Sequence, residues 1–114
     1  MHVRVEFDGT VVLALLDTGA VWSVVDAELA NELGFFERDG EPLTLTSRAG
    51  KFEGKLVRAV TRLVAEDGES VEIEATVFVS PEWREGNFIG YSGLLERIRF
   101  AVDPDTNSFI FGAL

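Results

Sequence analysis

The residue most suited to chemistry is Asp17, an acidic side chain in an apolar run that is followed by Thr18 and Gly19. Burial of a lone ionised carboxylate costs several kcal/mol unless a partner compensates for the lost water. Gly19 has no Cβ, so other backbone can approach closely, and its N–H can donate to the carboxylate. The pattern predicts a carboxylate held on a tight loop for acid–base work. The alternative is an ordinary turn with a solvated aspartate.

Other kinds of catalytic site are excluded by composition. The chain has no cysteine, which excludes disulfides, thiolate catalysis and cysteine-based zinc sites. Its one histidine, His2, cannot build a Ser-His-Asp triad or a multi-histidine metal site easily. The two glycine-rich motifs that bind the phosphates of nucleotides, GxGxxG and GxxxxGK[ST], are both absent from the sequence. Any enzymatic chemistry therefore rests on carboxylates and water, and the sequence implies no cofactor and no metal.

The size and charge of the chain limit its partners. We expect residues 1–114 to form a single domain, because a chain of this length suits one hydrophobic core. No apolar run is long enough to span a membrane, so we expect a soluble, cytoplasmic protein. The net charge of −10 argues against binding to nucleic acid or to an anionic membrane. The same charge opposes self-association.

The elements around Asp17 are predicted to be strands. Residues 2–7 alternate apolar and polar side chains, and the following Asp8-Gly9 pair is a hairpin signal. Residues 11–16 are apolar on both faces, so we expect them to be buried on both faces. A further short strand is predicted at 21–25.

The rest of the chain adds further strands and two short helices. Asp26 is a good N-cap for a helix over 26–34, and Ser92 is the expected N-cap of a second helix over 92–98. The chain is therefore predicted to be mainly β, and closed or nearly closed. The other predicted strands lie at 42–47, 55–66, 70–79, 99–103 and 108–114, and residues 88–90 form a short apolar piece after a loop.

The segment ALLDTGAVWSVV resembles the active-site segment of retropepsin-like aspartic proteases, in which an apolar strand precedes D-[TS]-G-[AS]. Ser23 occupies the Ser or Thr position of the strand that follows. The family's second signature, two apolar residues and a glycine before a short helix, is matched by Phe88, Ile89 and Gly90. Residues 46–55 match the β-hairpin flap. The resemblance covers nearly the whole chain, implies a closed acid-protease barrel, and is closer to cellular and bacterial members than to viral ones.

The resemblance implies an aspartic endopeptidase. Because the chain has one D-T-G loop, a complete site requires a homodimer in which each subunit supplies Asp17, and the two carboxylates share one proton. The substrate would be a peptide or protein in extended form. The implied catalytic residues are Asp17, Thr18 and Gly19, and the implied substrate-binding residues are Ala20, Val21, Trp22, Arg48, Ala49, Gly50, Lys51, Phe52 and Ile89.

Other functions stay open at this point. One is a catalytically silent retropepsin-fold module that binds peptide or only dimerises. Another is a domain that acts only within a larger polyprotein or fusion. The silent module is favoured by three departures from the retroviral pattern. Val21, Trp22 and Tyr91 stand where retroviral members have acidic residues that hold substrate backbone and an arginine that pairs with one of them.

The flap and the C-terminal strand each allow two interpretations. Arg48 and Lys51 form a basic flap tip, which could attract acidic substrates or could simply be a solvated hairpin end. Phe109, Ile110 and Phe111 are expected to form the main dimer sheet, because an exposed apolar edge would invite aggregation. The alternative is that these three residues close the chain's own barrel.

Overall fold

The computed structural model describes residues 1–114 and begins with the predicted hairpin. β1 (His2–Phe7) and β2 (Thr10–Leu16) are antiparallel, with Phe7 opposite Thr10. Asp8 and Gly9 have φ values of 47° and 88°. Both positive angles fit the two-residue turn that matches the twist of a hairpin. The Asp8-Gly9 prediction is confirmed.

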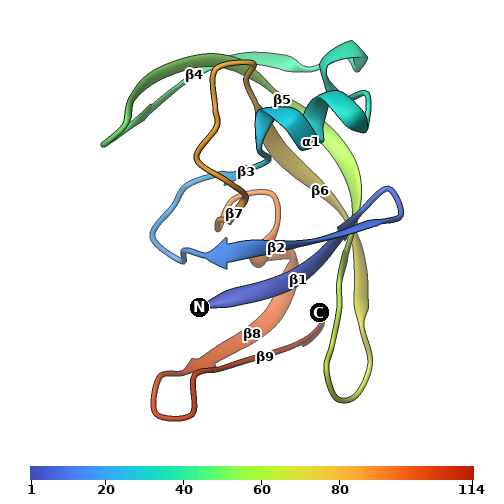
Figure 1. Ribbon diagram of the computed structural model, residues 1–114. Coiled ribbons are helices and arrows are strands. Elements are labelled where there is room, and N and C mark those ends of the chain that lie inside the picture. The colour runs from blue at the N-terminus through green and yellow to red at the C-terminus, as the bar shows by residue number, and fades with distance from the viewer.

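The sheet pairing closes six strands into a barrel, whose arrangement can be followed in Figure 1. Their order around the barrel is β1, β2, β7, β3, β6, β5, and the ring closes where β1 pairs with β5. The predicted closed, mainly β fold is confirmed. The strands not yet given are β3 (Ser23–Val24), β5 (Gly50–Leu63), β6 (Val71–Val79) and β7 (Phe88–Ile89).

A long hairpin extends beyond the barrel where β4 (Glu41–Ser47) pairs with the first half of β5. Ser47 lies opposite Gly50, which leaves Arg48 and Ala49 at the tip. This hairpin, called the flap below, projects toward the same side of the view as the loop that follows β2 (Figure 1). The flap predicted at 46–55 is therefore the outer part of a longer hairpin.

The first predicted helix is present as α1 (Ala27–Glu32). The Asp26 side chain accepts a hydrogen bond from the Glu28 N–H at 3.0 Å, so the predicted N-cap is confirmed. A 3₁₀ turn, η1 (Phe35–Glu37), follows Gly34, whose φ of 73° ends the α-helix.

The second predicted helix, over 92–98, is wrong. Only a 3₁₀ turn, η2 (Leu95–Arg97), forms there, and Ser92 does not cap it. The Ser92 backbone instead bridges to Trp22, and Gly93 has a φ of 79°. A residue in the left-handed region cannot lie within an α-helix, so the helix cannot begin at Ser92.

The expectation that residues 11–16 are buried on both faces is also wrong within one chain. Ala14 is buried, but Val11 and Leu13 are 52% and 59% exposed. The inner face of β2 packs on the barrel core, whereas no layer of the same chain covers its outer face.

The C-terminal hairpin, β8 (Ile98–Asp103) and β9 (Ser108–Ala113), forms a separate two-stranded sheet. Phe109 and Phe111 pack against the main core, whereas Ile110 is 60% exposed. Because β1 and β5 already close the barrel, the interpretation in which residues 109–111 close it is wrong.

Two hydrophobic clusters stabilise the fold. The main cluster fills the barrel and continues under α1. The second, called the flap cluster below, consists of the buried residues Val24, Phe52, Phe78 and Trp83. None of the helices has the length and apolar character needed to cross a membrane.

Candidate active site

Asp17 lies immediately after the last residue of β2, where the parallel partner strand β7 fixes its backbone. Leu16 pairs with Ile89, and the Asp17 N–H donates to the Ile89 carbonyl oxygen at 2.9 Å. The D-T-G loop and the Phe88-Ile89-Gly90 signature, far apart in the sequence, are therefore neighbours. The sequence predicted both segments, and the barrel brings them together.

The loop holds the carboxylate by a hydrogen bond between residues two apart in the sequence. The Gly19 N–H donates to Asp17 Oδ1 at 3.1 Å, as expected from the sequence. A Cβ at Gly19 would lie 3.5 Å from that oxygen, which is ordinary contact, so space within one chain does not require a glycine here. Asp17, Thr18 and Gly19 are all exposed. The burial expected of Asp17 is therefore not provided by a single chain.

Position 90 requires a glycine, because the backbone of Trp22 approaches it too closely for a Cβ. A Cβ on Gly90 would lie 2.5 Å from the carbonyl carbon and oxygen of Trp22. The Gly90 N–H donates to the hydroxyl oxygen of Ser23 at 2.8 Å, and Ser23 is fully buried. Ser23 thus ties the strand after the D-T-G loop to the second signature.

Two further backbone bonds fix the segment between Asp17 and Ser23. The Tyr91 N–H donates to the Ala20 carbonyl at 2.9 Å, and the Ser92 N–H donates to the Val21 carbonyl at 2.7 Å. The loop therefore rests on the chain that follows Gly90. This pairing is also what prevents the helix expected over 92–98.

The predicted substrate-binding residues near the loop differ in exposure. Val21 is 61% exposed, and Tyr91, which lies beside it, is 49% exposed. Trp22 is partly buried against the flap cluster. Ile89 is fully buried in the main core, so its side chain is a core residue rather than the substrate contact expected from the sequence.

The predicted flap residues divide into an exposed tip and a buried anchor. Arg48, Ala49, Gly50 and Lys51 are exposed, and neither basic side chain forms an ion pair. Phe52 is only 9% exposed, because its ring packs on the flap cluster. Most of the Phe52 surface is thus used to anchor the flap.

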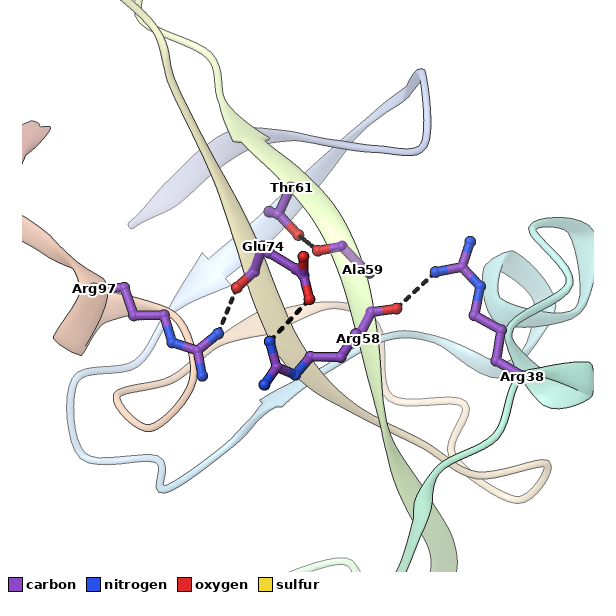
Figure 2. Close-up of polar contacts among 6 residues, drawn as sticks. All are labelled: Arg38, Arg58, Ala59, Thr61, Glu74 and Arg97. Atoms are coloured by element: carbon purple, nitrogen blue, oxygen red, sulfur yellow. Dashed lines mark hydrogen bonds and ion pairs between the residues drawn. The ribbon is translucent and has the colours of Figure 1, made fainter.

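A polar network on β5 and β6 supports the turn after the second signature (Figure 2). Arg97 in η2 donates to the Glu74 carbonyl, and the Glu74 side chain pairs with Arg58 at 2.9 Å. On the other side, Arg38 donates to the Arg58 carbonyl at 2.7 Å. The Arg58–Glu74 side chains are more than 60% exposed, so this ion pair contributes little stability by itself.

Two surface cavities, of about 590 and 410 Å³, lie away from Asp17. The larger lies between the start of β1, the β5–β6 loop and β9, and is lined in part by Leu13 and Ile110. The smaller is lined in part by Trp22. No group of three or more His, Asp or Glu side chains is arranged to hold a metal ion.

Sequence reasoning missed Trp83. It lies in a polar loop, over 80–87, where a surface position is the natural expectation, yet it is 6% exposed. Its indole N–H donates to the Gly86 carbonyl at 2.8 Å. The available signal was a large apolar residue in an otherwise polar loop, three residues before a glycine. The loop sequence alone does not show which side chains the ring packs against.

Comparison with known proteins agrees with this geometry. A family model described as aspartyl protease matches residues 3–92, well over half of the chain. The crystal structure of a retropepsin-like aspartic protease from Rickettsia conorii is similar, with a TM-score of 0.69 and 19% sequence identity over 98% of this chain and 88% of that chain. Identity at that level shows the fold alone. No curated protein matches the chain in sequence.

The family match spans both signatures, since Asp17 and Gly90 fall within residues 3–92. The structural match extends over the C-terminal hairpin as well. The chain belongs to the aspartyl protease family, and its fold is retropepsin-like.

Proposed function

We propose that the protein is an aspartic endopeptidase that acts as a homodimer, with Asp17 of each subunit forming the catalytic pair. The observation that carries this proposal is the state of Asp17 in one chain. It lies exposed at the end of a barrel strand, oriented by the Gly19 N–H, and it is the only aspartate of a D-T-G loop in the sequence. One carboxylate cannot act as acid and base at once, whereas two facing copies can.

The proposed mechanism follows from two carboxylates within hydrogen-bond reach. Both cannot ionise cheaply, so one proton is held between them. The ionised Asp17 accepts a proton from a water molecule, whose oxygen attacks the peptide carbonyl carbon. The protonated Asp17 gives its proton to the carbonyl oxygen. As this tetrahedral intermediate breaks down, the C–N bond is cleaved and the amine nitrogen takes the proton that the first Asp17 accepted from water. A hydroxyl of the intermediate gives its proton to the other Asp17, so a carboxylic acid and an amine are released and the pair again holds one proton.

Dimer formation is supported by an unpaired, partly apolar edge. β9 pairs only with β8, so its other edge is free. Ile110 is 60% exposed on that strand, and Leu114 just after it is 76% exposed. Free strand edges with apolar side chains are ready to pair with a second chain. The net charge of −10 on each subunit opposes this association, most strongly at low salt.

The test is peptide cleavage by the wild type and by Asp17→Asn. We expect the variant to remain a dimer by sedimentation and to lose all detectable cleavage of a proteome-derived peptide library between about pH 3 and 8. Asp105→Asn, an exposed aspartate in the β8–β9 turn, is the matched control and should retain activity. Cleavage that persists in Asp17→Asn would refute the catalytic role.

A catalytically silent peptide-binding or dimerisation module is the second candidate. It is favoured by the absence of the acidic side chains that hold substrate in retroviral members and of the arginine that pairs with one of them, since those positions hold Val21, Trp22 and Tyr91. Wild-type protein that binds extended peptides, or only dimerises, without cleaving any library member would support this function.

A further inference from the structure

The underside of the flap is apolar and lies on the flap cluster. Phe52 on β5 lies opposite Leu45 on β4, and both side chains contact the cluster. Phe52 is 9% exposed, whereas Lys51 beside it is exposed. The packed part of the flap therefore ends at the Leu45–Phe52 pair, and the tip beyond that pair is solvated.

Three aromatic rings connect the flap to β7, the strand that pairs with the end of β2 before Asp17. The ring centroids of Phe52 and Trp83 are 4.9 Å apart, with 70° between the planes. The centroids of Trp83 and Phe88 are 5.8 Å apart, at 80°. Both are edge-to-face arrangements, which aromatic rings favour. Phe88 lies in β7 and pairs with Leu15 of β2. Leu15 comes only two residues before Asp17.

Hydrogen bonds from both its side chain and its backbone hold Trp83 in place. Its indole N–H donates to the Gly86 carbonyl at 2.8 Å, and its carbonyl accepts from the Ala27 N–H at 2.8 Å. The Gly86 N–H donates to the side chain of Asp26 at 3.2 Å. The loop that carries Trp83 is thus fastened to the N-terminus of α1, so the ring is a fixed support.

The base of the flap is fastened separately from its outer part. The Ser80 hydroxyl donates to the Glu53 carbonyl at 2.6 Å, and a Cβ on Gly54 would lie 2.2 Å from the Val79 carbonyl oxygen. These contacts hold β5 from Glu53 toward the barrel. Between them and the exposed tip, the Phe52–Trp83 contact is the outermost aromatic support of the flap.

We propose that Trp83 is the positioning residue of the flap, which holds the outer part of the flap in place relative to β7 and the Asp17 loop next to it. The effect on catalysis rests on the proposed function, since flap closure would hold the peptide and exclude water. The effect on the order of the flap does not depend on the proposed function, because it follows from the packing of Trp83 on Phe52 alone. Trp83 does not touch the reacting atoms in this role; it acts through Phe52.

The experiment compares Trp83→Leu with Trp83→Phe and with Phe35→Leu. Phe35 is fully buried in the main core, and its ring centroid lies 6.5 Å from that of Phe7 in an edge-to-face arrangement. Phe35→Leu is therefore a matched control, because it removes one aromatic pair at a place away from the flap. Hydrogen exchange of the peptide covering residues 43–54 is the first readout. We expect exchange to be roughly 3- to 10-fold faster in Trp83→Leu than in Phe35→Leu, and largely restored in Trp83→Phe.

Steady-state cleavage is the second readout. A misplaced flap raises KM, by roughly 10-fold, while kcat changes less; a merely structural loss lowers the fraction of active enzyme and leaves KM unchanged. If Trp83→Leu does not fold, Phe52→Leu removes the same contact from the flap side. Equal exchange at 43–54 in Trp83→Leu and Phe35→Leu would overturn the proposal. A wild type without protease activity would refute the proposed function instead, and the exchange result would still decide the role of Trp83.

Discussion

The Ser23–Gly90 hydrogen bond gives the sharpest test of how the site is held. Ser23 is fully buried, and its hydroxyl oxygen accepts from the Gly90 N–H at 2.8 Å. Ser23→Ala leaves that N–H buried without a partner. An unsatisfied buried donor costs about 1–3 kcal/mol, more than the net value of a typical hydrogen bond. We therefore expect Ser23→Ala to lower the free energy of unfolding by about 2 kcal/mol.

The loss should be visible in both stability and activity. A change of 2 kcal/mol lowers the Tm of a domain of this size by roughly 8 °C or more. Urea unfolding at a fixed protein concentration measures the free energy, since dimer formation makes stability concentration-dependent. Activity should fall as well, because Gly90 and Tyr91 hold the segment after Asp17.

Ser108→Ala is the control for this measurement. The Ser108 hydroxyl is bonded only within the β8–β9 turn, to Thr106, so its removal should change stability by less than about 0.5 kcal/mol. If Ser23→Ala is no less stable than Ser108→Ala, the Gly90 N–H has another partner and the account of the site is wrong.

Three further predictions concern the site, the outer network and the dimer. Gly90→Ala should destabilise by about 3 kcal/mol or more, measured by urea unfolding, because the new Cβ would meet Trp22 backbone at 2.5 Å. Glu74→Gln should change stability by less than about 1 kcal/mol, since its ion pair with Arg58 is exposed; a larger loss in the same assay would contradict this. Ile110→Arg should weaken both dimerisation, as measured by sedimentation, and cleavage of the peptide library. A variant that is fully dimeric and active would exclude β9 from the interface.

The local features of this fold could be predicted from the sequence. The Asp8-Gly9 turn and the Asp26 N-cap each depend on residues that are neighbours in the chain. The alternation of residues 2–7 predicted β1, because side-chain period in a strand is local too. The D-T-G loop and its second signature were also visible, since each is a short string with a specific composition.

Only the tertiary structure decided which of these segments meet. The turn at Ser92 is not a helix because its backbone pairs with residues 70 positions earlier, and no local propensity reports such a contact. Trp83 supports the flap because its loop is hydrogen-bonded to the start of α1, through the Ala27 N–H and the Trp83 carbonyl oxygen. The outer face of β2 and the Asp17 side chain are exposed because no other part of the chain covers them. Sequence fixes the kind of side chain at each position, but burial depends on what the whole fold, or a second chain, places against it.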